Sequence, residues 1–156
     1  MIHLTITGNT THLKSAEKKQ PEAILRLGDE LLAEKFFSEF PPTSDEIDSA
    51  INYTEEMLAP VEDRFVVDTD LYTDDSMALQ IAGLAFNTSN EGKRIGVPVI
   101  ELENVFFRLS EIVNGLPASQ DVLPQSKQFA AYLLILREVM HHLGFERLEV
   151  EVSTNI

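Results

Sequence analysis

Alternating apolar and polar residues at both ends of the chain are its strongest constraint on the fold. Ile2, Leu4 and Ile6 alternate with polar residues near the start, and residues 148–152 repeat the pattern near the end. A period of two is typical of a strand with one buried face and one wet face. The two ends of the chain therefore predict strands of a β-sheet, on which the intervening helices must pack.

The segments between these ends predict an α/β protein. Strands are expected at 13–16, at 23–27 and at the apolar run Phe65–Val67, whereas 87–94 is interpreted as a polar connection and 97–100 is too short to assign. Helical spacing of apolar residues predicts helices over 28–38, 43–58, 76–86, 102–113 and 129–143, the last apolar nearly all round and so buried. Thr43 with Glu46 forms a capping box at the second helix. This order predicts a single ribonuclease H-like domain over 1–156, with a mixed sheet of about five strands and helices on both faces.

The composition excludes some classes of function. Twelve basic and 26 acidic residues give a net charge of −14 over 156 residues, which argues against a nucleic-acid partner and repels polyphosphate at long range. The chain has no cysteine, so a disulfide framework is excluded. No signal peptide or membrane span is recognisable, and a cytoplasmic protein without a membrane partner is expected.

The turn after the first strand carries a resemblance to a known family. Residues 5–13 read Thr-Ile-Thr-Gly-Asn-Thr-Thr-His-Leu, and the exopolyphosphatase and guanosine pentaphosphate phosphatase (Ppx/GppA) family has Asp-Ile-Gly-Gly-Gly-Ser-Thr-Glu-Leu here. The rest of the chain resembles the second domain of that family in order, through Leu27-Gly28, Pro41-Pro42-Thr43, 102–109, 129–144 and the closing strand to Ser153. The resemblance implies the ribonuclease H-like fold of the actin-like superfamily, with catalysis in a cleft between two domains. The family's first domain is absent from the 156 residues, so a partner chain or a second copy in a homodimer is expected to supply its surface.

The first phosphate loop of that family is altered here. Thr5 stands where the family has a metal-binding aspartate, His12 where it has a glutamate, and only Gly8 remains of its three glycines. Asn9 tolerates a left-handed backbone, so the turn itself is expected to persist. The hydroxyls of Thr10 and Thr11 either bond an anion or bond within their own turn. Gly8, Asn9, Thr10 and Thr11 are therefore candidates for a vestigial phosphate loop.

The second loop, residues 68–76, has no glycine and four aspartates, which oppose a phosphate. Asp75 and Ser76 suit the N-cap of the next helix. Asp68, Asp70 and Asp74 resemble the opening of a calcium loop, although the glycine and the terminal glutamate of such a loop are missing. A solvated capping loop and a weak metal site are both open interpretations.

No cofactor, metal centre or catalytic residue is expected from the sequence. His141 and His142 are adjacent, point to different faces of a helix and are interpreted as surface or half-buried residues. Two functions are compatible with these observations. The first is a non-catalytic binding, regulatory or interaction module. The second is a phosphohydrolase for polyphosphate or guanosine pentaphosphate that needs a partner domain or subunit.

Overall fold

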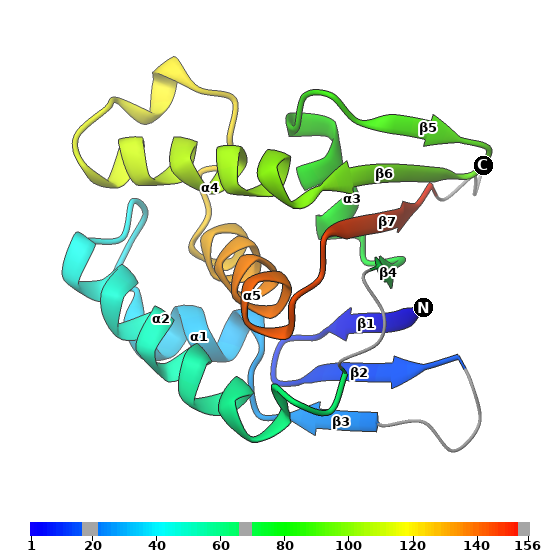
Figure 1. Ribbon diagram of the computed structural model, residues 1–156. Helices are drawn as coiled ribbons and strands as arrows, with labels where there is room; N and C mark the ends of the chain where they lie inside the picture. The colour runs from blue at the N-terminus through cyan, green and yellow to red at the C-terminus, as the bar shows by residue number, and fades with distance from the viewer. Residues whose placement is uncertain (17–21, 66–69, 153–156) are drawn as a thin grey trace.

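In the part of the chain that the structure describes, a seven-stranded mixed sheet and five α-helices form the fold (Figure 1). The computed structural model describes residues 1–16, 22–65 and 70–152. The strands are β1 (Ile2–Ile6), β2 (Thr11–Ser15), β3 (Glu22–Leu25), β4 (Asp70–Thr73), β5 (Ser89–Glu91), β6 (Arg94–Pro98) and β7 (Arg147–Glu151). The α-helices are α1 (Asp29–Phe36), α2 (Ser44–Leu58), α3 (Ser76–Leu84), α4 (Val99–Val113) and α5 (Lys127–Leu143), and short 3-10 helices lie at Ala59–Val61 and Ala118–Gln120.

The strand order β3-β2-β1-β4-β7-β6-β5 confirms the ribonuclease H-like core. β1, β2 and β3 form an antiparallel meander, and β4 and β7 continue the sheet parallel to β1. The prediction of about five strands was short by two, because the hairpin of β5 and β6 extends the sheet beyond β7. β5 and β6 are short, and β6 pairs with β7, about 50 positions away in the chain, so local periodicity did not indicate a hairpin.

The fourth strand lies later in the chain than predicted. Phe65 is buried but is not in a strand, and Val66 and Val67 lie outside the described residues. β4 instead comprises residues that were interpreted as the acidic loop. Asp70 and Tyr72 face the wetter side of this strand, whereas Leu71 and Thr73 are buried. Because the pattern includes a carboxylate and a threonine, it is a weaker strand signal than a run of apolar residues.

The described helices pack on one face of the sheet, whereas helices on both faces were predicted. Residues such as Leu4, Leu71 and Val150 are buried on that face. The opposite face carries polar side chains, among them His3, Lys14, Tyr72, Arg94 and Glu149. Both crossovers, from β3 to β4 and from β4 to β7, run in the same direction along the sheet. Because crossovers between parallel strands are right-handed, they place their helices on the same face.

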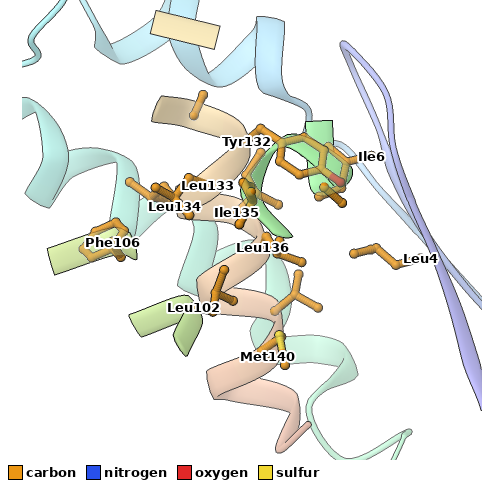
Figure 2. Close-up of a cluster of buried hydrophobic side chains, with 14 of the residues drawn as sticks. Leu4, Ile6, Leu102, Phe106, Tyr132, Leu133, Leu134, Ile135, Leu136 and Met140 are labelled. Carbon is orange, nitrogen blue, oxygen red and sulfur yellow. The ribbon is translucent and has the colours of Figure 1, made fainter. Parts of the chain in front are cut away.

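Helix α5 forms the centre of the core, as its apolar sequence predicted (Figure 2). It contacts α1, α2 and α4, and Leu133, Leu134, Ile135 and Leu136 are all fully buried. The helix ends at Gly144, whose φ of 76° is left-handed and suits a residue without Cβ. In the described part of the chain, α5 and the other helices are too short or too polar to cross a membrane.

The predicted capping box at α2 is present. The Thr43 hydroxyl accepts a hydrogen bond from the backbone N–H of Glu46 at 3.1 Å, and the Glu46 carboxylate accepts one from the backbone N–H of Thr43 at 2.9 Å. These bonds lower the pKa of Glu46, together with a hydrogen bond from the Ser38 hydroxyl, which is the largest cause. The start of α2 was therefore readable from the local sequence alone.

Candidate functional site

A cavity of about 260 Å³ lies where the carboxyl ends of β1 and β4 meet. Because the two strands are neighbours and parallel, the loops that follow them lie at the same edge of the sheet. This edge is where open α/β sheets bind their ligands. The lining residues come from the end of β1, from both loops, from the first turns of α1 and α3 and from the first two turns of α5: Ile6, Thr7, Gly8, Asp29, Asp75, Ser76, Met77, Gln128 and Tyr132.

The loop after β1 is a turn closed by its own hydrogen bonds. The backbone N–H of Thr10 donates to the Thr7 hydroxyl at 3.0 Å, and the N–H of Asn9 approaches the same oxygen at 3.4 Å. The N–H of Thr7 donates to the carbonyl of Thr10 at 2.8 Å. A phosphate loop depends on several free amides that point at one anion. Three amides of this loop are already bonded within it.

The hydroxyls of this loop are also engaged. The Thr10 hydroxyl lies 2.8 Å from that of Thr7. Thr11 is fully buried, and its hydroxyl donates to the carbonyl of Leu27. The turn is present, but Asn9 does not have a left-handed backbone. Among the described residues, Asn87 is the only non-glycine residue with a positive φ. The Thr10 hydroxyl thus bonds within its own turn, as one of the two interpretations had it, whereas the Thr11 hydroxyl bonds to Leu27 outside the turn.

The start of α1 covers the outer side of this turn. The N–H of Asp29 donates to the carbonyl of Thr7 at 3.2 Å, and the N–H of Leu31 donates to the carbonyl of Gly8 at 2.9 Å. A Cβ at Gly8 would lie 2.6 Å from the Glu30 carboxylate, and one at Gly28 would lie 2.2 Å from the carbonyl oxygen of Gly8. Gly8 and Gly28 therefore permit close packing of the turn on the helix, with a carboxylate beside the loop.

Thr5 and His12 lie opposite each other on paired strands. His12 Nε2 is 2.6 Å from the Glu22 carboxylate of β3, so this side chain is paired across the sheet. Neither residue lines the cavity.

Asp75 is the central polar residue of the cavity. It occupies the N-cap position of α3, as predicted, but its side chain makes no capping hydrogen bond. One carboxylate oxygen instead accepts hydrogen bonds from the backbone N–H of Ile6 at 2.9 Å and from the Tyr132 hydroxyl at 2.8 Å. Burial raises the pKa of Asp75, and these two hydrogen bonds partly oppose the rise. Burial and the nearby charge of Asp75 raise the pKa of Tyr132 well above its ordinary value.

The sequence did not indicate this pairing. Asp75 and Tyr132 are 57 positions apart, and Tyr132 was included within an apolar helix. A hydroxyl on an otherwise apolar helix is the available signal, because a buried tyrosine usually finds a partner for its O–H.

A second carboxylate, Asp29, lines the same cavity. Its two oxygens accept hydrogen bonds from the Gln128 side-chain amide at 3.0 Å and from the N–H of Glu30 at 2.9 Å. No lysine, arginine or histidine is among the described lining residues. The cavity is therefore acidic, and a bound phosphate would meet like charge at short range.

Two of the three calcium-loop candidates, Asp70 and Asp74, lie among the described residues and have different partners. Asp68 lies outside the described residues. Asp70 begins β4, opposite Arg147 of β7, whereas Asp74 follows the end of β4 and lies 3.5 Å from His3 Nε2. Four residues of extended chain place the Cα atoms of Asp70 and Asp74 about 13 Å apart.

The strand order and the helices packed on the sheet define a ribonuclease H-like fold, with the cavity at the edge of its sheet. Solved structures of Ppx/GppA proteins share this fold. The Ppx/GppA enzyme of Aquifex aeolicus superposes with a TM-score of 0.75 at 19% identity, over 97% of this chain and 52% of that one. An exopolyphosphatase from Cytophaga hutchinsonii gives a TM-score of 0.71 at 12% identity, over 97% and 52% of the two chains.

The chain thus spans about half the length of the solved structures that it matches, as the resemblance to one of two domains predicted. No family model matches the sequence, and no curated protein matches it either. At these identities the likeness establishes the fold and leaves the activity to be inferred from the site.

Proposed function

We propose that this chain is a non-catalytic binding, regulatory or interaction module on an exopolyphosphatase-like fold. One observation carries the proposal: the turn at Thr7–Thr10 uses its own amides, so they do not offer a cradle to an anion. The carboxylates of Asp29 and Asp75 line the adjoining cavity and add like charge. The chain would keep the scaffold of a phosphatase domain without its phosphate chemistry.

The proposed partner supplies the surface that would face this cavity. The matched structures are about twice as long as the matched region. In a two-domain arrangement the carboxyl ends of β1 and β4 would border the cleft. Either a second protein or a second copy of this chain would cover the cavity, in the cytoplasm, and nucleic acid is not expected among its partners because the net charge is −14.

Binding and light-scattering measurements test this proposal. Calorimetric titration with polyphosphate and Mg²⁺ is expected to give no saturable heat, and incubation is expected to release no phosphate above buffer. Saturable binding to the isolated chain would refute the loss of the anion site. Size-exclusion chromatography with light scattering is expected to show a concentration-dependent dimer if the second copy is the partner, and a monomer at all concentrations would eliminate self-association.

The alternative is a phosphohydrolase that acts on polyphosphate or guanosine pentaphosphate when a partner completes the cleft. The Asp75–Tyr132 pair favours it, because a partly buried carboxylate with a raised pKa in a cavity is typical of proton-transfer sites. Phosphate release is then expected only after a first-domain partner is added, and Asp75→Asn is expected to abolish it. Unchanged release by Asp75→Asn would eliminate Asp75 as its proton-transfer group.

A further inference from the structure

A second polar cluster lies between α2 and α5, away from the cavity. Glu55 projects from α2, and Glu138 and His142 are one turn apart on α5. His142 Nε2 lies 3.0 Å from a Glu138 oxygen and 3.4 Å from a Glu55 oxygen. Ten residues of helix separate His142 from Tyr132, which corresponds to about 15 Å along α5.

The orientation of the His142 ring leaves one nitrogen without a hydrogen bond. Nδ1 lies 3.1 Å from the Glu62 carboxylate, to which a protonated Nδ1 donates. In the tautomer that carries its proton on Nδ1, the other ring nitrogen, Nε2, can offer its lone pair to a metal ion. This atom is buried, has no hydrogen-bond partner and faces the oxygens of Glu138 and Glu55. A lone pair facing two carboxylates is unfavourable, and either a proton on Nε2 or a bound metal ion would relieve this repulsion.

The spacing of these atoms matches the coordination shell of a small metal ion. Zinc binds imidazole nitrogen at about 2.0–2.1 Å and carboxylate oxygen at about 2.0–2.2 Å. In a tetrahedral shell, neighbouring ligand atoms are therefore about 3.4 Å apart. The distances from Nε2 to the two oxygens are 3.0 and 3.4 Å, and all three atoms lie within 4.8 Å of one another.

The charges around the cluster also favour a cation. Glu138 is 1% exposed, and its other oxygen accepts a hydrogen bond from Arg137 at 2.7 Å, which balances one negative charge. Glu55 and Glu62 add two further carboxylates. The hydrogen bond from a ligating histidine to a carboxylate is the usual means of holding such a ring in place, and here Glu62 has that position.

We propose that Glu55, Glu138 and His142 bind one divalent transition-metal ion, with Glu62 orienting the imidazole. An imidazole with two carboxylates suits Zn²⁺ and its neighbours better than Ca²⁺ or Mg²⁺, which prefer all-oxygen shells. Because its ligands come from two helices, the ion would fasten α2 to α5. Glu138, four positions before His142, is its partner at helical spacing, whereas His142 was interpreted from the adjacent His141 alone.

Calorimetric titration of the metal-stripped 156-residue chain with ZnCl₂ at pH 7 tests the site. One equivalent is expected to bind, and Glu55→Gln and His142→Gln are each expected to weaken binding at least tenfold. Glu56→Gln and His141→Gln are the matched controls, since each alters an exposed neighbour of the same residue type. Both controls are expected to bind zinc like the wild type.

Thermal unfolding provides a second readout. A ligand that binds only the folded state raises the midpoint of unfolding, so zinc is expected to raise it in the wild type and in both controls. This increase in the unfolding midpoint is expected to be lost in Glu55→Gln. Because Glu55 is partly exposed, its substitution leaves the hydrophobic core intact. The proposal is overturned if no one-to-one binding occurs, if Glu55→Gln binds as the wild type does, or if His141→Gln loses binding as well.

Discussion

Tyr132→Phe isolates the hydrogen bond at the centre of the candidate site. The substitution removes the hydroxyl that donates to Asp75 at 2.8 Å and leaves a ring of nearly the same shape in a position that is 1% exposed. A hydrogen bond to a charged group contributes about 1.5–3 kcal/mol. We therefore expect the free energy of unfolding to fall by about 2 kcal/mol at pH 7.

Urea denaturation followed by circular dichroism measures this loss, and Tyr53→Phe is the matched control. The Tyr53 hydroxyl donates to the backbone carbonyl of Arg26 at 3.1 Å in an exposed setting, so its removal is expected to cost about 0.5 kcal/mol. In an Asp75→Asn background the acceptor is neutral, and Tyr132→Phe should then cost only about 1 kcal/mol. Equal losses in the two backgrounds would show that the hydroxyl does not interact with a charged Asp75, and the reasoning would be refuted.

Other predictions concern the titration of Asp75, one helix start and two glycines. Because burial raises the folded-state pKa of Asp75, its contribution to stability is fully present below its unfolded pKa and is lost as pH rises through the folded pKa. The free energy of unfolding of the wild type, relative to that of Asp75→Asn, should therefore rise as the pH falls between these two pKa values. A difference that does not change with pH would contradict this prediction. Thr43→Ala should cost about 1 kcal/mol in urea denaturation, because it removes the side-chain cap of α2. Gly28→Ala should cost about 2 kcal/mol or more, because the new Cβ would meet the backbone of the loop after β1. Gly83→Ala on α3, with nothing within 4 Å, should instead stabilise the chain by about 0.5–1 kcal/mol.

Much of the fold was readable because its signals are local. The alternation in residues 2–6 predicted β1, the apolar surface of residues 129–143 predicted a buried α5, and Thr43 predicted the start of α2. The hairpin of β5 and β6 was missed because both strands are short and β6 joins the sheet through pairing with the distant β7. β4 was misplaced because its partly exposed positions include the carboxylate of Asp70, so its sequence was interpreted as an acidic loop rather than as a strand.

The candidate sites were less predictable than the fold. The turn at residues 7–10 was located correctly, since a glycine after a strand is a local signal. The roles of its amides were not readable, because they depend on the Thr7 hydroxyl and on the packing of α1. Asp75 was interpreted as a helix cap, yet its carboxylate bonds to β1 and α5.

By itself, the sequence determined the five helices, the strands near the two ends of the chain and the strongly acidic charge, because these properties depend on residues close together or on simple sums. Only the tertiary structure decided which polar groups meet. It placed Asp75 beside Tyr132, and it placed Glu55 beside Glu138 and His142. A hydrogen bond or an ion site acts over about 3 Å, whereas its partners can be tens of residues apart, so its existence depends on packing that no local pattern encodes.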